Sequence, residues 1–170
     1  IASFYQKEIE FKFFARYLKD QGTEDMPEAY VFNTGTKKWE KHDVWPPKEA
    51  ASLQMRFEPN GKLVINKEVS AENAFEYISD PAKPVPYTSQ TEGLTFTPRN
   101  FMSDDQREAS MRPDVLTFET EVLGDEVTIA GEILAKLKVA MSGTDADFIV
   151  KLIDVYPDNH PNYEHNPKNI

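Results

Sequence analysis

The sequence predicts a mainly β protein, a jelly-roll-like antiparallel β-sandwich with one N-terminal helix. From Pro27 onward, hydrophobic residues alternate with polar ones, which is the period of a strand with one buried face. Pro, Gly, Asn and Asp separate these alternating stretches, and they are residues that favour turns. One stretch alone has the three- and four-residue spacing of a helix. Antiparallel strands joined by turns are therefore expected, rather than a parallel sheet.

The helix is predicted over residues 3–21. Hydrophobic residues recur there at mostly three- and four-residue intervals, with Ser3 available as the N-cap and Gly22 as the stop. Phe11, Phe13 and Phe14 together cover more than one stripe of such a helix. We therefore expect the helix to be buried against other surfaces on two sides.

Two hairpins are expected after the helix. In the first, strands over residues 28–33 and 39–45 flank a turn at residues 34–36. In the second, strands over residues 52–57 and 63–65 flank the turn Pro59-Asn60-Gly61. Residues 80–99 hold four of the twelve prolines and no sustained period, which predicts a long ordered loop.

The strongest alternation lies in the last third of the chain. It predicts a long core strand over residues 127–141, with Gly131 at a bulge or bend. Residues 116–122 precede this stretch and residues 148–152 follow it, each across a turn rich in Gly and Asp. Three antiparallel strands are expected here, followed by a polar tail after Tyr156.

Composition limits the classes of function. The chain has 170 residues, enough for one core, and its 29 acidic and 19 basic side chains give a formal charge of −10. That charge repels phosphate backbones and anionic lipids, so neither nucleic acid nor membrane is an expected partner. No apolar run is long enough to span a bilayer. The absence of cysteine excludes disulfides and Cys-ligated zinc but leaves the cellular compartment open.

The residues by themselves assign no catalytic, cofactor-binding or metal site. An α/β-hydrolase presents its nucleophile in a G-x-S-x-G turn, and no serine of this chain has that context. His42 lies in the first hairpin, and His160 and His165 lie in the polar tail. Without a nucleophile beside them, none of the three is assigned as a general base. No cofactor is expected.

Two polar clusters leave alternatives open. Asp145, Asp147 and Asp154, with Asp158 farther along, offer carboxylates to a hard cation such as calcium, but their spacing lacks the full EF-hand pattern. Asp is common in turns and at strand ends, and this is the interpretation we favour. Residues 103–107 and 112–114 predict a capped helical turn in which Arg107 or Arg112 pairs with a carboxylate.

Aromatic residues suggest a rival function. Trp39, Trp45 and Tyr87 have the side chains of a sugar-stacking platform, as in a free-standing carbohydrate-binding module. Packing in a core or between domains is the favoured interpretation of the two tryptophans. Exposed, coplanar rings would support the platform, and buried rings would argue against it.

Several segments resemble one family. Residues 112–121, 126–131 and 143–158 are similar to the C-terminal domain of X-Pro dipeptidyl-peptidase and cocaine-esterase-like hydrolases. Residues 79–81, 84–87 and 13–19 are especially similar to the α-amino-acid ester hydrolase and glutaryl-cephalosporin acylase branch. The resemblance spans nearly the whole chain.

The resemblance implies an architecture. A preceding α/β-hydrolase domain would hold a Ser-Asp-His triad, a helical cap would cover the triad, and a jelly-roll domain would pack alongside. Residues 1–22 would then be the last helix of the hydrolase domain, and residues 23–170 the sandwich. Family members continue with further strands past the equivalent of Ile170. The sandwich is therefore expected to be incomplete at its C-terminus, to expose strand edges and to self-associate.

The resemblance also implies a function. The chain would be the non-catalytic C-terminal domain of a serine hydrolase that acts on small acyl or α-amino-acyl substrates. It would stabilise the catalytic domain and help to shape substrate access, and it would be inactive alone. Its partner would be the α/β-hydrolase domain of the parent chain, and a periplasmic or secreted parent is compatible with the sequence.

Overall fold

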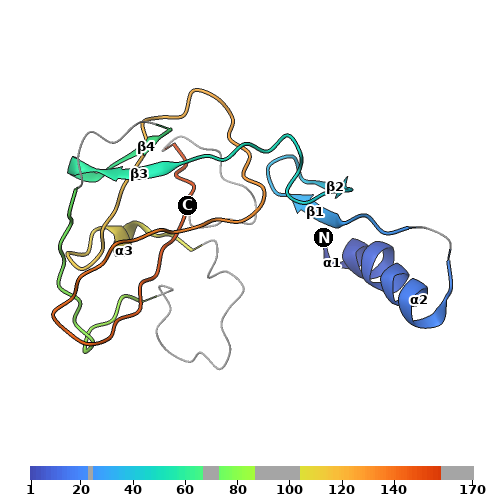
Figure 1. Cartoon of the computed structure of the whole chain (residues 1–170), viewed down its shortest axis with the longest axis horizontal. Coiled ribbons are helices and arrows are strands. Elements are labelled where there is room, and N and C mark those ends of the chain that lie inside the picture. Colours follow the sequence, from blue (N-terminus) through green and yellow to red (C-terminus); the bar gives the residue numbers. More distant parts are fainter. Residues whose placement is uncertain (23–24, 67–72, 87–103, 158–170) are drawn as a thin grey trace. The chain divides into compact units, whose positions relative to one another are not determined.

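The structure is a computed structural model that describes residues 1–22, 25–66, 73–86 and 104–157 (Figure 1). The chain divides into two compact units. The first comprises Ile1–Ser52 with Glu126–Lys136, and the second Leu53–Asp125 with Leu137–Ile170. The helix and one hairpin lie in the first unit, and the other hairpin lies in the second. Each unit is described by itself below.

The predicted N-terminal helix is confirmed, with different ends. It consists of α1 (Ala2–Phe4), a π-helical segment η1 (Tyr5–Glu10) and α2 (Phe11–Lys19). Ser3 was expected as the N-cap, but it lies inside α1, and the N-cap Ile1 makes no side-chain capping bond. The helix ends before Gly22, because Asp20 already adopts the left-handed conformation, with φ 50°. Asp tolerates that conformation better than most residues.

The first predicted hairpin is confirmed. Strand β1 (Ala29–Asn33) pairs antiparallel with β2 (Lys38–His42), and Val31 stands opposite Glu40. The turn is built by the Asn33 side chain, whose Oδ1 accepts hydrogen bonds from the backbone N–H groups of Gly35 and Thr36, both at 3.0 Å. A side chain that bonds to the backbone two or three residues later stabilises a turn locally. This hairpin is therefore closed by neighbouring residues.

The second predicted hairpin is also confirmed. Strand β3 (Met55–Glu58) pairs antiparallel with β4 (Lys62–Ile65) across the 3-10 turn η2 (Pro59–Gly61). Its outer edge is partly covered by the chain near Glu119. The Leu63 N–H donates to the Glu119 carbonyl at 2.7 Å, and the Glu119 N–H donates to the Gly61 carbonyl at 2.8 Å. These two bonds form an isolated parallel bridge.

The three strands predicted over residues 116–122, 127–141 and 148–152 form no ladder in the described part of the chain. The expected bend at Gly131 is present, with φ 106°. Alternation specifies which side chains share a face, but a strand also needs a partner backbone about 4.8 Å away. The described residues supply such partners to the two hairpins, so the described part of the fold is mainly β and antiparallel, and it does not confirm the predicted jelly roll. Most of the predicted loop over residues 80–99 lies outside the described residues.

Aromatic clusters organise each unit, although none of the described hydrophobic residues is fully buried. In the first unit, the Phe4 ring stacks on Trp39 at a centroid distance of 5.2 Å, and Trp39 also meets Tyr30 and Phe32 edge-on. In the second unit, the Phe118 ring stacks on Phe57 at 4.4 Å and contacts Phe75. No described helix is long and apolar enough to cross a membrane.

Candidate functional site

One face of helix α2 is both hydrophobic and exposed. Phe11, Phe14 and Leu18 follow one another at intervals of three and four residues and therefore share one face. Phe11 is 68% exposed and Leu18 is 75% exposed. Phe13 and Tyr17 lie farther round the helix, with their rings 4.7 Å apart. We call Phe11, Phe14 and Leu18 the aromatic helix face.

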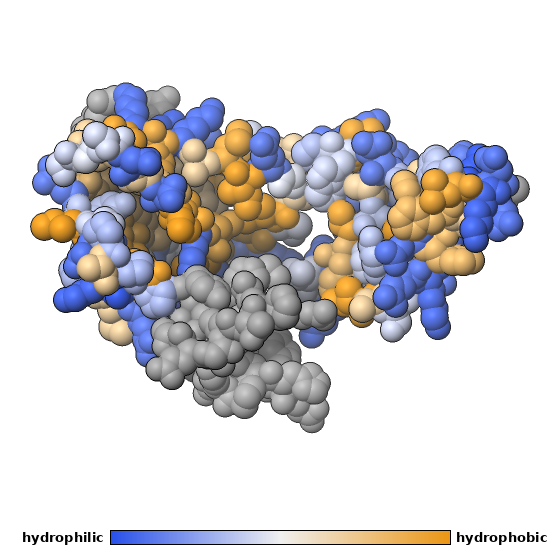
Figure 2. Space-filling model, turned by 90° about the horizontal axis from the view of Figure 1, so that it is seen from below, coloured by the Kyte–Doolittle hydropathy of each residue, from blue (hydrophilic) through white to orange (hydrophobic). Residues whose placement is uncertain are grey.

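Hydrophobic side chains lie open over the helical part of the first unit (Figure 2). The cationic residues Lys12, Arg16 and Lys19 are at i, i+4 and i+7, so they share another side of the same helix. A surface helix normally turns its apolar stripe toward a core and its charges toward water. Within its own unit, α2 leaves its apolar stripe uncovered. Large exposed apolar patches mark sites where proteins bind one another.

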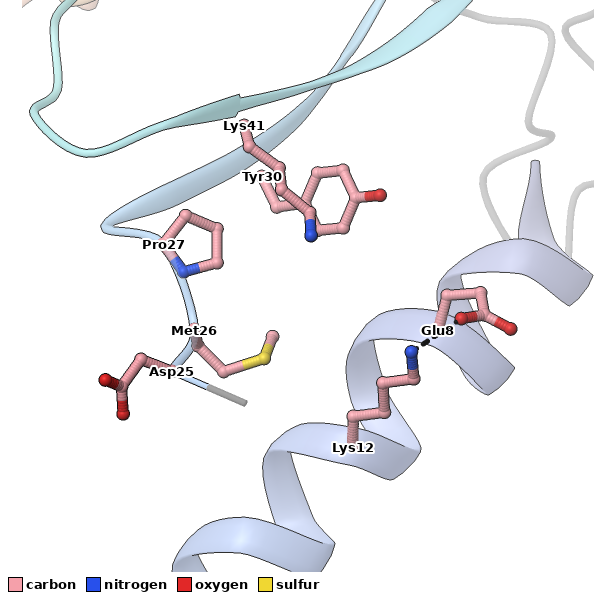
Figure 3. Close-up of a pocket in the computed structure, with 7 residues that line it drawn as sticks. All are labelled: Glu8, Lys12, Asp25, Met26, Pro27, Tyr30 and Lys41. Atoms are coloured by element: carbon pink, nitrogen blue, oxygen red, sulfur yellow. Dashed lines mark ion pairs between the residues drawn. The ribbon is translucent and has the colours of Figure 1, made fainter. Parts of the chain in front are cut away.

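A small pocket lies between the helix and the first hairpin (Figure 3). The Lys12 Nζ lies 2.8 Å from the Glu8 carboxylate, and hydrogen bonding from Lys12 lowers the pKa of Glu8. Across the pocket, the Lys41 ammonium lies 5.2 Å from the centre of the Tyr30 ring. The pocket holds about 70 Å³, room for a few waters but not for a substrate. It is lined by Glu8, Lys12, Asp25, Met26, Pro27, Tyr30 and Lys41.

The tryptophans do not form a sugar-stacking platform in the described residues. Trp39 is partly buried, and one of its faces is covered by the Phe4 ring, at an interplanar angle of 20°. Trp45 is partly exposed and meets the His42 ring edge-on. Tyr87 lies outside the described residues. Trp39 thus serves packing between helix and hairpin, as the favoured interpretation predicted.

The histidines and acidic residues are placed as follows. His42 is partly buried, and its Nε2 lies 3.8 Å from the Glu40 carboxylate. His160, His165 and Asp158 lie outside the described residues. Asp145, Asp147 and Asp154 are exposed, and no group of three or more His, Cys, Asp or Glu side chains able to hold a metal ion occurs in the part of the chain that the structure describes.

The second polar cluster forms the predicted helical turn, α3 (Arg107–Ser110), but its N-cap residue, Gln106, makes no side-chain capping bond. The Asp105 carboxylate accepts a hydrogen bond from the Arg107 backbone N–H at 2.9 Å and also binds the Arg107 guanidinium. Farther along, Arg112 binds Asp114 through two parallel hydrogen bonds of 2.8 and 2.6 Å. Bonding from Arg112 lowers the pKa of Asp114, and the same bonding raises the pKa of Arg112.

Sequence reasoning missed two contacts that join distant parts of the second unit. The Arg112 guanidinium donates to the Lys83 carbonyl at 2.9 Å, across 29 residues of sequence. Lys62 pairs with Glu121 at 3.2 Å, beside the bridge to Glu119. Neither contact has a local sequence signal, because its partners are brought together only by the folded chain.

The described residues thus combine two antiparallel hairpins with an uncovered aromatic helix face. Residues 21–168 match the family described as the X-Pro dipeptidyl-peptidase C-terminal non-catalytic domain. The chain belongs to this family, which confirms the resemblance to the C-terminal domain of X-Pro dipeptidyl-peptidase and cocaine-esterase-like hydrolases.

Two relatives place the chain more closely. It is 33% identical over 156 residues to a cocaine esterase from Rhodococcus sp. (strain MB1 Bresler), an alignment that covers 86% of this chain and 27% of the esterase. It is also similar to the crystal structure of an aminopeptidase from the marine sediment archaeon Thaumarchaeota archaeon, with a TM-score of 0.57 and 34% identity. That likeness covers 71% of this chain and 20% of the aminopeptidase. The chain thus spans about a quarter of one relative and a fifth of the other.

Proposed function

We propose that this chain is the C-terminal domain of a serine hydrolase and that it stabilises the catalytic region and helps to shape substrate access. The family is described as non-catalytic, and the two relatives, an esterase and an aminopeptidase, are several times longer than the aligned segment. Small acyl or α-amino-acyl compounds are the proposed substrates of the parent enzyme. The bond classes named by the two relatives, esters and peptides, agree with this choice.

The aromatic helix face is the single observation that carries the proposed docking role. A free helix gains nothing from presenting Phe11, Phe14 and Leu18 to water, since each exposed side chain of this size forgoes about 1.5–3 kcal/mol of burial. A catalytic region packed on this face would recover that free energy. The match to the family begins at residue 21, just after the helix. This supports assigning residues 1–22 to the hydrolase domain and residues 23–170 to the β-domain.

A complete jelly roll remains part of the proposal. Residues 127–141 keep the alternation of a core strand, and their hydrophobic side chains are exposed, with Ile133 at 65%. Pairing with further strands would bury these side chains. Alone, the chain is expected to associate with copies of itself at micromolar concentration, because open edges and apolar side chains favour pairing. A strictly monomeric mass by light scattering would argue against this part of the proposal.

Sequencing the coding DNA upstream of this segment tests whether the parent protein is a serine hydrolase. We expect one continuous reading frame with a G-x-S-x-G sequence, followed by the Asp and His of a triad. The upstream region, produced alone, should melt at a lower temperature than the same region produced together with this chain. The isolated chain should not hydrolyse p-nitrophenyl esters. Turnover by the isolated chain, or an upstream frame without a nucleophile, would refute the proposal.

A further inference from the structure

Among the described residues, the side chain of Arg112 contacts the backbone of a segment far away in the sequence. This contact plays no part in the docking proposed for the aromatic helix face. Its Nε and one Nη bind the two oxygens of Asp114, and the same Nη also donates to the Lys83 carbonyl. The Asp114 side chain is only 13% exposed. A carboxylate held by both oxygens fixes the plane of the guanidinium and therefore the direction of its remaining donors.

The backbone places Asp114 for this purpose. Residues 112–115 form a turn in which the Val115 N–H donates to the Arg112 carbonyl at 3.2 Å, with Pro113 at the second position. Proline is favoured there because its ring presets the φ angle. The turn brings the carboxylate back beside the arginine two residues earlier. The pair is therefore formed locally and is available to bind a distant partner.

That partner is a second turn, at residues 80–83. The Asp80 side chain accepts a hydrogen bond from the Ala82 N–H, and the Asp80 carbonyl accepts one from the Lys83 N–H, both at 2.9 Å. The Lys83 carbonyl takes part in neither bond and accepts the hydrogen bond from Arg112. Pro81 and Pro84 restrict the backbone on both sides of it. Two locally formed turns thus meet at one hydrogen bond.

We propose that Arg112 is a positioning residue and that it clasps the turn at residues 80–83 to the turn at residues 112–115. The clasp fixes the segment of residues 73–86, which exposes Tyr77, Ile78 and Val85, with Ile78 85% exposed. The other contacts of this segment within the described residues include the hydrogen bond from Asn73 to Glu58 at 3.2 Å and the contact of Phe75 with Phe118. The inference does not depend on the proposed function.

Amide hydrogen exchange on the full 170-residue chain tests the clasp. In Arg112→Lys, the ammonium cannot span both carboxylate oxygens and the distant carbonyl, so the Ala82 and Lys83 amides should exchange at least about fivefold faster. Asp114→Asn, which keeps the shape and removes the charge, should give a smaller acceleration. If one variant fails to fold, the other provides the same test.

Arg107→Lys is the matched control, because Arg107 also binds a carboxylate two residues away, that of Asp105. It should leave exchange at Ala82 and Lys83 unchanged. The amides of the β3–β4 ladder serve as the internal reference for general stability. Unchanged exchange at Ala82 and Lys83 in both Arg112→Lys and Asp114→Asn would overturn the proposal. So would an equal acceleration at these amides and in the ladder, since Arg112 would then support the whole unit rather than one turn.

Discussion

The hairpin β1–β2 and the stretch of residues 127–141 are both predicted as strands from their hydrophobic residues, but of the two only the hairpin forms a ladder. In the hairpin, the turn after Asn33 brings the second strand back at once, and the Asn33 side chain stabilises that turn. Residues 127–141 have no such neighbour among the described residues. The difference teaches that the pattern of hydrophobic residues decides which side chains share one face of an extended segment. The segment becomes a strand only where a second backbone lies beside it and pairs with it.

The largest expected effect comes from Gly131, where the stretch of residues 127–141 lies close to Pro46. It has φ 106°, and a Cβ added there would lie 2.8 Å from the Pro46 side chain. Gly131→Ala should therefore lower the free energy of unfolding by about 3 kcal/mol, from backbone strain and overlap together. Chemical denaturation measures this value. Gly124→Ala, with nothing within 4 Å of the added Cβ, is the control and should change it by less than about 1 kcal/mol. Equal effects would mean that residues 127–141 are not anchored at Gly131.

A somewhat smaller effect is expected at Gly61, where the second hairpin meets the chain near Glu119. Gly61 has φ 69°, and an added Cβ would approach the Thr117 carbonyl oxygen to 3.2 Å. We expect Gly61→Ala to cost about 2 kcal/mol, because the hairpin must move away from residues 117–119. Gly143→Ala is the matched control, since its nearest atom is 4.0 Å away. If both variants unfold at the same denaturant concentration, the close approach of the added Cβ to Thr117 does not lower the stability.

Asn33→Ala tests the local closure of the first hairpin. The substitution removes the acceptor of two backbone hydrogen bonds in an exposed turn, so about 1 kcal/mol of stability should be lost. Asn33→Asp keeps the acceptor oxygen but replaces the Nδ2 that donates to the Glu40 carboxylate at 3.0 Å with a second carboxylate oxygen, so it should recover only part of that loss. Thermal unfolding of the three proteins gives the comparison. No loss in Asn33→Ala would show that the ladder closes without help from this side chain.

The smallest effect is a pH dependence at Asp114. Arg112 holds the pKa of Asp114 below its ordinary value of 3.8 in the folded chain. The pair therefore stabilises the fold fully above that value, and the contribution is lost as the pH falls from there through the lower folded pKa. The stability difference between the wild type and Asp114→Asn should be larger at pH 6 than at pH 3. A difference that is the same at both pH values would contradict this assignment.

The sequence was sufficient for the elements whose partners are close by. The helix, both hairpins and the helical turn at Arg107 follow from spacing, turn residues and short-range pairing. The helix ends were misplaced, since Asp20 competes with Gly22 for the left-handed position. The contacts from Arg112 to Lys83 and from Leu63 to Glu119 could not be predicted, because they depend on how separate turns meet.

The candidate docking face was visible in the sequence as an excess of aromatic residues at positions 11, 13 and 14. What the sequence could not show was which side of the helix the hairpin would cover. Trp39 stacks on Phe4, and Glu8 and Lys12 line the pocket beside the hairpin. The side of the helix that carries Phe14 and Leu18 is left exposed. The helix, which we expected to be buried on two sides, is therefore covered on one side within the described chain. We propose that the catalytic region covers the other side.

The most direct test of that assignment is a calorimetric titration of this chain into the protein encoded by the upstream frame. Burial of the aromatic helix face predicts binding with a clearly negative heat-capacity change. In Phe11→Ser/Leu18→Ser the affinity should fall at least about tenfold and the heat-capacity change should shrink, whereas Lys19→Ser, on the cationic side of the helix, should behave as the wild type. Binding with the same affinity and heat-capacity change in all three proteins, or no binding at all, would contradict the account.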